Sequence, residues 1–216
     1  MLGALQLAFI DSVNLLLIGV IVAVGIAARQ NYAKTTALLI AGDWCGVAGL
    51  ALIMLVIFDG LGPVVQRFVE GPVFGILLIA TGILTAVLAL RGGDNQALVQ
   101  KIMRPLHTPG PATVATGVVL GLIQSATSVP FYGGLALLSA AGIDAQVRYA
   151  AIPLYATVAL SLPTLAALAV GWVRAKPDSA AARGFDWARA HPSQVTAAAT
   201  WSVAVLLIVL GVTHMV

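Results

Sequence analysis

The chain has 216 residues, of which 60% are hydrophobic and only 9% are charged, and its mean hydropathy is +1.02. Soluble domains carry about 25% charged residues and keep a polar exterior, so this composition excludes a soluble globular protein and predicts an integral membrane protein. The net charge of +3 alone would also fit a nucleic-acid binder, but the positions of the basic residues explain it differently, and no nucleic-acid partner is expected.

Six apolar stretches are long enough to cross the hydrocarbon core of a bilayer, which takes about 20 helical residues. These stretches cover residues 4–27, 36–58, 72–91, 112–139, 149–173 and 196–215. Polar breaks separate them at 28–35, 59–71, 92–111, 140–148 and 174–195. The sequence therefore predicts an all-α integral membrane protein with about six transmembrane helices, which form a single transmembrane domain over residues 1–216.

The basic residues gather in alternate breaks. Nine of the eleven Lys and Arg residues lie in or beside the first, third and fifth breaks, whereas the second and fourth breaks contain only Arg67 and Arg148. Cytoplasmic loops of membrane proteins carry an excess of Lys and Arg. We therefore expect loops 28–35, 92–111 and 174–195 to be cytoplasmic and both termini to be extracytoplasmic.

Two cytoplasmic breaks contain segments of mixed polarity. The segment 94–104 begins with Asp94 and sets apolar side chains near one face, and the segment 179–190 places Phe185 and Trp187 beside two arginines. Such segments form short amphipathic helices in the headgroup plane or simple solvated loops, and the sequence leaves both interpretations open.

A weak internal repeat relates the two halves of the chain. When residues 4–25 are set against 117–138, the matched residues are Leu7, Ile10 and Ser12 with Leu120, Ile123 and Ser125, and the polar pairs Asp11 with Gln124 and Asn14 with Thr127. Each half has three spans, an odd number, so the halves would be inverted in the membrane. The predicted organisation is repeat one at 1–91, a cytoplasmic linker at 92–111 and repeat two at 112–216, a plan that recurs in secondary transporters with binding sites near the midplane.

The fourth span contains a polar interruption. Residues 124–130 read Gln-Ser-Ala-Thr-Ser-Val-Pro. A proline removes a backbone donor and clashes with the preceding turn, and nearby hydroxyls can bond the freed backbone groups. This pattern predicts a broken fourth helix, and an ordinary proline kink is the alternative. Pro153 and Pro163 are likewise expected to bend the fifth span.

Two aspartates lie inside predicted spans, Asp11 in the first and Asp43 in the second. A charged residue at the membrane centre costs about 2.5–3.5 kcal/mol on insertion scales, so it normally faces the bundle interior or a cavity. Each carboxyl is a candidate carrier of a proton or a cation. The alternative is that each one serves only to fix helix packing through hydrogen bonds.

Other polar side chains fall at corresponding depths of the first, fourth and fifth spans. With Ser128 completing the polar set, the candidate substrate- and ion-binding residues are Asp11, Ser12, Asn14, Asp43, Gln124, Ser125, Thr127, Pro130, Tyr132 and Tyr155. Two GxxxG motifs, Gly42 with Gly46 and Gly117 with Gly121, predict close helix contacts, either within the chain or in a homodimer.

Several chemistries are excluded by the residues available. Cys45 is the sole cysteine, so neither an intrachain disulfide nor a thiol relay is possible. An intramembrane serine protease needs a buried histidine, but His107, His191 and His214 lie in predicted loops or at the terminus. A soft-metal site needs clustered Cys, His or Met ligands. We therefore expect no enzyme activity, no catalytic residue, no metal and no cofactor.

The polar motifs that open the two halves also suggest a family. With Phe9-Ile-Asp-Ser-Val-Asn14 in the first and Leu122-Ile-Gln-Ser-Ala-Thr-Ser-Val-Pro130 in the second, the chain resembles the lysine-exporter superfamily. Within it, Asp11-Ser12 followed by an apolar run is most similar to actinobacterial membrane proteins of the glycopeptidolipid-addressing (GAP, Sap-like) type. Many relatives have Asn-Pro where this chain has Asn14-Leu15, so whether the first helix also breaks stays open.

The resemblance implies a multi-pass protein of the bacterial inner (plasma) membrane that exports a small molecule or moves an envelope lipid. The family motif would mark Asp11, Asn14, Gln124 and Thr127. The expected function is a secondary transporter coupled to protons or ions through Asp11 or Asp43. The alternative is a non-transporting subunit that scaffolds an envelope-assembly complex. The expected partners are membrane lipids, the substrate, and a second copy of the chain or an envelope-complex protein.

Overall fold

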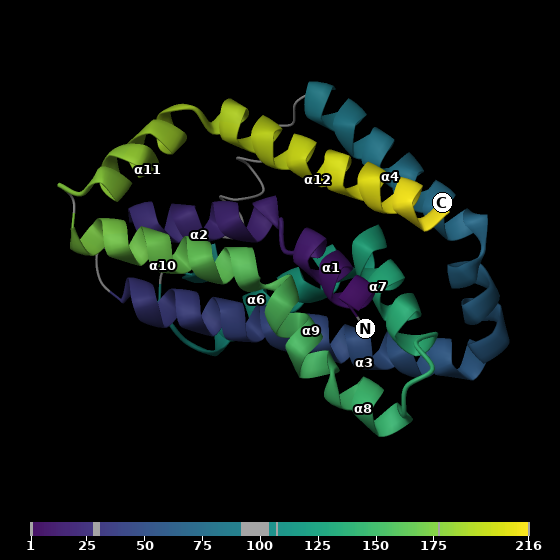
Figure 1. Cartoon of the computed structure of the whole chain (residues 1–216). Coiled ribbons are helices and arrows are strands. Elements are labelled where there is room, and N and C mark those ends of the chain that lie inside the picture. Colours follow the sequence, from purple (N-terminus) through teal and green to yellow (C-terminus); the bar gives the residue numbers. More distant parts are fainter. Residues whose placement is uncertain (1, 28–30, 92–103, 107, 177, 216) are drawn as a thin grey trace.

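The computed structural model describes residues 2–27, 31–91, 104–106, 108–176 and 178–215, and this part of the chain is all-helical (Figure 1). In chain order the elements are α1 (Leu2–Asp11), α2 (Leu15–Ala27), α3 (Tyr32–Glu70), α4 (Pro72–Arg91), the 3-10 helix η1 (Arg104–Leu106), α6 (Pro111–Ala126), α7 (Val129–Ser139), α8 (Ala145–Ala150), α9 (Ile152–Ala159), α10 (Ser161–Ala175), α11 (Ala180–Ala190) and α12 (Pro192–Met215). The predicted all-α class is confirmed.

Most of the apolar helices are bent. In the described residues, α3 is long and apolar enough to span a membrane by itself. Three helix pairs pass the same test only when each pair is taken together: α1 with α2, bent by 48°; α6 with α7, bent by 77°; and α8–α9 with α10, bent by 43°. Shorter apolar segments lie in α4 and α12. The structure thus gives between one and four candidate spans by these criteria, and the count of six stays a prediction.

The predicted broken fourth helix is confirmed, because α6 ends at Ala126 and α7 begins at Val129. The Ser128 hydroxyl accepts a hydrogen bond from the Phe131 backbone N–H at 3.2 Å and so caps α7. Pro130 lies in the first turn of α7, where its missing N–H leaves no helical hydrogen bond unmade. The sequence Ser-Val-Pro therefore both ends one helix and starts the next.

The first helix breaks as well, although it lacks a proline. Asn14 caps α2 by accepting a hydrogen bond from the Leu17 N–H at 3.0 Å, and the Ser12 hydroxyl donates to the Phe9 carbonyl at 2.5 Å. Side-chain caps of this kind compete with continuation of a helix. The fifth span bends at Leu160, as expected, because Pro163 has no N–H to donate to the Ala159 carbonyl.

The break predicted at 59–71 is wrong in its extent. Helix α3 continues to Glu70 with a kink at Gly62, whose φ and ψ of 12° and −85° are not helical, directly before Pro63. Among the predicted amphipathic segments, 179–190 forms α11, while 94–104 lies outside the described residues except for Arg104. The position of α11 relative to the membrane stays a prediction.

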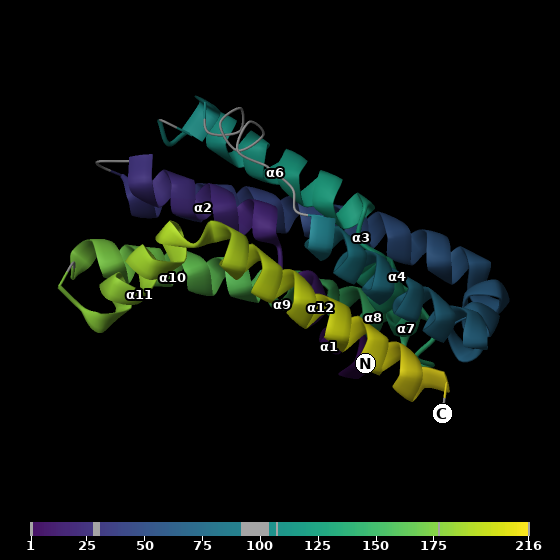
Figure 2. The ribbon, with the colours of Figure 1, turned by 90° about the horizontal axis from the view of Figure 1, so that it is seen from above.

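The two GxxxG motifs face each other where α3 packs along α6. A Cβ atom added to Gly117 would lie 2.8 Å from the backbone nitrogen of Asp43, and one added to Gly121 would lie 2.7 Å from Oδ1 of the same residue. Gly42 and Gly46 similarly approach the backbone of α6. The motifs therefore bring two helices of one chain together, and a homodimer stays a prediction. A second pair, α4 and α12, lies side by side in both views (Figures 1 and 2).

The buried core surrounds the two halves of α3. Its second half packs against α7 and α9, with Leu55, Phe131 and Tyr155 all buried. Its first half belongs to a cluster with α2 and α10 that contains Leu39 and Val170. Helix α3 thus forms the common wall of both clusters.

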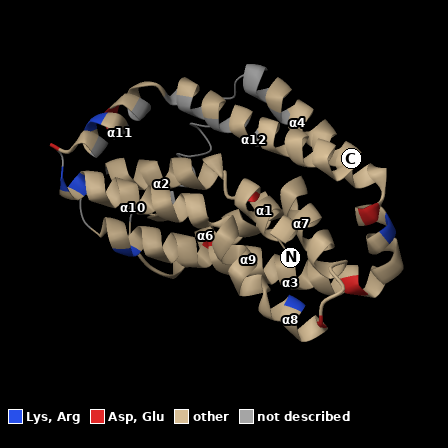
Figure 3. Ribbon diagram, viewed as in Figure 1, with Lys and Arg blue, Asp and Glu red and all other residues tan. Residues whose placement is uncertain are grey.

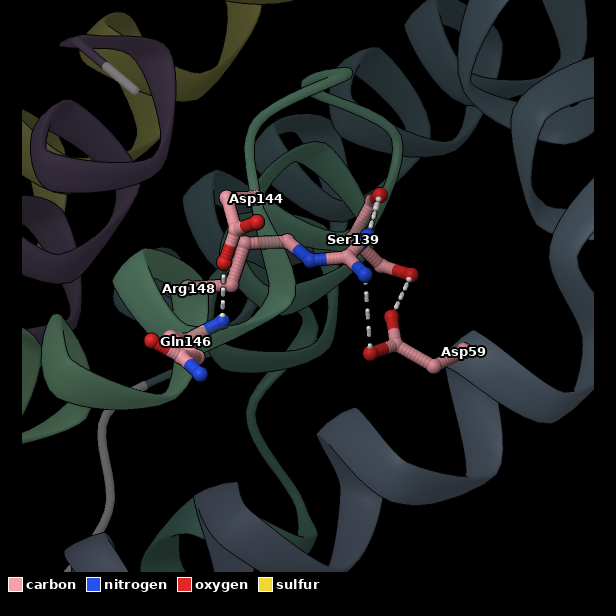
Figure 4. A network of polar contacts seen from close by, with 5 residues as sticks. All are labelled: Asp59, Ser139, Asp144, Gln146 and Arg148. Atoms are coloured by element: carbon pink, nitrogen blue, oxygen red, sulfur yellow. Dashed lines mark hydrogen bonds and ion pairs between the residues drawn. The ribbon is translucent and has the colours of Figure 1, made fainter.

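Polar contacts join the breaks in pairs at the two ends of α3. At one end Arg148 of α8 forms an ion pair with Asp59 at 3.2 Å, and the Ser139 hydroxyl donates to the same carboxylate at 2.6 Å (Figure 4). At the other end the Arg174 side chain donates to the Gly25 carbonyl. The predicted second and fourth breaks therefore meet near one end of α3, and the ends of α2 and α10 meet at the other. Which end faces the cytoplasm stays a prediction.

Candidate functional site

The three helix breaks meet around a polar pocket of about 250 Å³. Its lining includes Asn14 from the break between α1 and α2, Thr127 and Ser128 from the break between α6 and α7, and Leu160 from the break between α9 and α10. Helix ends within a membrane leave backbone groups without intrahelical partners, and their dipoles attract ions of either sign. Such discontinuous helices commonly surround the binding sites of transporters. The pocket is therefore the candidate functional site.

Asp43 is joined to the pocket through an amide. Its side chain is fully buried, and both carboxylate oxygens accept hydrogen bonds from Nε2 of Gln124, each at 2.7 Å. The Gln124 carbonyl oxygen accepts in turn from the Asn14 side-chain amide. The result is a continuous chain of hydrogen bonds from α3 through α6 to the start of α2.

Asp11 lies in the pocket lining itself. It is the last residue of α1, and its carboxylate accepts a hydrogen bond from the Ser128 hydroxyl at the start of α7. Asp11 therefore links the break between α1 and α2 to the break between α6 and α7. Among the described residues, the hydrogen-bond donors to Asp11 and Asp43 are the uncharged side chains of Ser128 and Gln124, so one carboxyl group lies in the pocket lining and a second lies beside it.

Ser125 adds an unsatisfied polar group. The residue is 1% exposed and lines the pocket, and its hydroxyl has no hydrogen-bond partner within the described part of the chain. Buried polar groups in proteins are nearly always hydrogen-bonded, so such an exception needs an explanation. A ligand, an ion or water in the pocket would provide the missing partner.

The structure brings six of the ten predicted site residues together. Asp11, Asn14, Gln124, Ser125 and Thr127 line the pocket, and Asp43 joins them through Gln124. The other four do not line it. Ser12 and Pro130 are buried at the helix breaks, the Tyr132 hydroxyl donates to the Ala126 carbonyl at 3.1 Å, and the Tyr155 hydroxyl donates to the Phe131 carbonyl at 3.1 Å. Ligand binding by any of the ten stays a prediction.

The break between α9 and α10 is the part of the site that the pattern of polar residues in the sequence did not indicate. Ala159 and Leu160 line the pocket with apolar side chains, and a search for polar residues inside spans passes over them. The available signal was Pro163, which leaves the Ala159 carbonyl without its helical donor. A proline inside an apolar span thus marks the carbonyl four residues earlier as an acceptor without its helical donor.

Apolar helices that break around a buried polar pocket define an all-helical membrane protein. Residues 5–213 match the family described as Sap, sulfolipid-1-addressing protein, and the chain belongs to this family. The comparisons with curated proteins and with solved structures gave no match. The resemblance to Sap-like proteins is therefore confirmed, whereas the wider relation to the lysine-exporter superfamily stays a prediction.

Proposed function

We propose that this protein is a secondary transporter that moves an envelope lipid or a small molecule across the bacterial inner membrane. The observation that carries the proposal is the meeting of three helix breaks at one pocket that has the half-buried carboxyl group of Asp11 in its lining and the buried carboxyl group of Asp43 beside it. The family description refers to the addressing of a sulfolipid. From that description we take only the class of substrate, an envelope lipid, as part of the proposal for this chain.

The hydrogen bonds at the pocket cross between the two proposed repeats. Asn14 and Asp43 of repeat one bind Gln124 of repeat two, and Asp11 of repeat one binds Ser128 of repeat two. A proton or cation that reaches either carboxyl changes which of these bonds can form. Binding at the pocket would thereby alter the contact between the halves, as alternating access requires.

The packing of the helices supports an inverted repeat. Helix α2, the second piece of the first broken helix, packs against α10, and α7, the second piece of the fourth, packs against the second half of α3. The last helices of the two halves, α4 and α12, pack against each other. We propose on this basis that the halves are inverted repeats of the lysine-exporter type, with both termini extracytoplasmic.

The test is complementation of a deletion strain of the source bacterium. Surface-exposed and total envelope lipids are measured by mass spectrometry with wild type, with Asp11→Asn and with Asp43→Asn. We expect both variants to retain the total lipid pool but to lose the surface pool. Asp144→Asn is the matched control, because Asp144 caps α8 outside the pocket by accepting from the Gln146 N–H at 2.7 Å, and asparagine caps equally well.

A normal surface pool in the double variant Asp11→Asn, Asp43→Asn would contradict the proposal if the deletion strain itself lacks surface lipid. That result would instead favour the non-transporting scaffold, whose role does not depend on the two carboxyl groups. Equal protein levels in the membrane, checked by immunoblot, are required for either conclusion.

A further inference from the structure

A second cavity, of about 860 Å³, lies between the first half of α3 and helix α10. Its α3 wall includes the small residues Ala33, Ala37, Ala41 and Cys45, and the remaining α3 residues of the wall are Tyr32, Thr36, Ile40 and Trp44. Residues four apart lie on one face of a helix, so these side chains form one shallow wall. We call this cavity the α3–α10 groove.

The groove has the length of one membrane leaflet. From Ala33 to Cys45 it follows α3 for twelve residues, or about 18 Å at 1.5 Å per residue. The hydrocarbon core of a bilayer is about 30 Å thick, so one leaflet contributes about half of that. Ala33, Ala37 and Ala41 are exposed, so a lipid chain can reach the groove from the side.

One end of the groove has the residues of a membrane interface. The Tyr32 hydroxyl donates to the Ala167 carbonyl at 2.9 Å and so joins the two walls. The Arg174 guanidinium lies over the Tyr32 ring, 5.1 Å from the ring centre. The Lys176 ammonium lies over the Trp172 ring, 4.6 Å from the ring centre. Tyrosine and tryptophan are enriched at the level of the lipid headgroups.

The same end is positively charged. Lys34 lies in the first turn of α3, next to the groove residue Ala33, and it is exposed together with Lys176. Figure 3 shows Lys and Arg at the end formed by α10, α11 and the start of α3. Asp178 follows Lys176 but does not balance Lys34, Arg174 and Lys176. Basic pockets between transmembrane helices bind anionic lipid headgroups.

The other end of the groove approaches the polar pocket. Trp44 lines the groove, and its ring N–H donates to the Thr157 hydroxyl at 3.2 Å. The preceding residue, Asp43, faces Gln124 on another side of α3. The apolar groove and the polar pocket thus lie on neighbouring sides of α3.

We propose that the α3–α10 groove binds an acyl chain of an anionic membrane lipid, whose acidic headgroup lies against Lys34 and Lys176. The apolar wall would bind the acyl chain of the lipid, and the basic end would favour a negatively charged headgroup. The inference rests on the proposed function for its biological meaning, because the bound lipid would be cargo that enters from the predicted cytoplasmic leaflet.

The test uses the tryptophans of the groove as reporters. In a Trp187→Phe, Trp201→Phe background the remaining tryptophans are Trp44 and Trp172, which both line the groove. The protein is placed in nanodiscs of unlabelled phosphatidylcholine. In one series they contain increasing amounts of brominated phosphatidylglycerol, and in the other increasing amounts of brominated phosphatidylcholine. Brominated acyl chains quench tryptophan fluorescence. We expect phosphatidylglycerol to quench at a mole fraction that is lower by about fivefold if one lysine contacts the headgroup and by about thirtyfold if both do, since each contributes about 1 kcal/mol.

Two sets of variants separate the chain site from the charge site. Ala37→Leu, alone or with Ala41→Leu, should fill the groove and reduce quenching by both lipids, whereas Ala115→Leu, at an exposed position of α6 outside the groove lining, should not. Lys34→Gln with Lys176→Gln should abolish the preference for phosphatidylglycerol and leave quenching itself intact. Arg67→Gln, near the opposite end of α3, is the charge control.

Equal quenching by the two brominated lipids in the unsubstituted groove would overturn the inference, and so would equal effects of Ala37→Leu and Ala115→Leu. Weak quenching by both lipids together with a Cys45–Cys45 crosslink between copies would also overturn it, because a partner helix would then occupy the groove. The Asp43→Asn protein should keep the lipid preference. If the preference holds while Asp11→Asn and Asp43→Asn cells export normally, the lipid site stands and the proposed function fails.

Discussion

The polar pocket and the α3–α10 groove share the first half of α3 but differ in volume and polarity. The pocket has about 250 Å³ and is lined by the Asp11 carboxyl group, two side-chain amides and the Ser125 hydroxyl, which has no hydrogen-bond partner among the described residues, while Asp43 lies beside it. The groove has about 860 Å³ and is walled mainly by carbon. Pockets for drug-sized ligands measure about 300–1,000 Å³, so the pocket fits an ion, water or a small polar group, whereas the groove has room for a lipid chain.

The difference indicates a division of tasks between two faces of one helix. Asp43, Gly42 and Gly46 face α6, while the neighbouring Ala41 and Cys45 face the groove. An ion bound at the pocket and a chain bound in the groove would therefore both act on α3. The following changes test whether the two cavities can be disturbed separately.

The largest effect is expected from Gly121→Leu. A Cβ atom at this position would lie 2.7 Å from the Asp43 carboxylate, so leucine must push α3 away from α6. Overpacking of this kind typically costs about 1–3 kcal/mol of stability, and occasionally more. The melting temperature of the purified protein should fall sharply. Gly49→Leu is the control because nothing lies within 4 Å of the Cβ position there, and a similar fall in both variants would contradict the packing.

Arg148→Gln should lower stability without affecting either cavity. Arg148 and Asp59 have side chains that are 17% and 18% exposed, so loss of the arginine leaves a largely buried carboxylate without its cationic partner. We expect a loss of about 2 kcal/mol, between the values for exposed and fully buried pairs. Denaturant unfolding measures the loss, and Asp144→Asn is the control. A change in the lipid preference of the groove would show that the ion pair does more than hold α3 to α8.

Gln124→Leu should weaken the pocket and leave the groove unchanged. The substitution removes the donor to both oxygens of Asp43 and the acceptor for Asn14. Polar contacts between membrane helices average about 0.6 kcal/mol and reach about 1.7 kcal/mol, so we expect a loss of about 1 kcal/mol. Gln66→Leu, which removes an exposed hydrogen bond to Glu70, serves as the control. Loss of lipid quenching in Gln124→Leu alone would mean that the two cavities are not separate.

The smallest effect on stability is expected from Ser125→Ala. Since the buried hydroxyl has no protein partner among the described residues, its removal should leave the free energy of unfolding unchanged or raise it by about 1 kcal/mol. Export should nevertheless decrease if the hydroxyl binds a ligand, as the surface-lipid assay would measure. Ser202→Ala, in α12, is the control, since that hydroxyl bonds its own helix at 2.9 Å. A clear fall in the stability of Ser125→Ala would show that the hydroxyl has a structural partner.

The sequence indicated which polar residues lie close together better than it indicated the exact course of the helices. Polar residues inside apolar spans are costly unless they meet, so Asp11, Asn14, Asp43 and Gln124 could be grouped from the sequence alone. The proline of Ser-Val-Pro130 likewise identified the break in the fourth helix. A polar side chain in an apolar span, or a proline in a helix, has a free-energy cost that only a few structural arrangements remove.

The parts that could not be predicted depend on partners distant in the sequence. Asp59 reads as a loop residue, but α3 continues past it to Glu70, and its carboxylate pairs with Arg148, which is 89 positions away in the sequence. The first helix breaks through the caps of Ser12 and Asn14, and residues of these types also occur in continuous helices. The groove is lined by residues of both α3 and α10, so it becomes visible only when α10 is placed beside α3.

The hydrogen bonds of the pocket also constrain the order in which the protein is made. They join residues that are 81, 110 and 117 positions apart, and each bond connects the first half to the second. At a synthesis rate of about 5–20 residues per second, the ribosome needs roughly 4–16 s to proceed from Asp43 to Gln124. During that interval the newly inserted first half holds Asp11 and Asp43 without these partners. The nascent first half therefore needs a temporary source of polar contacts, which water or the insertion machinery must supply until Gln124 and Ser128 arrive.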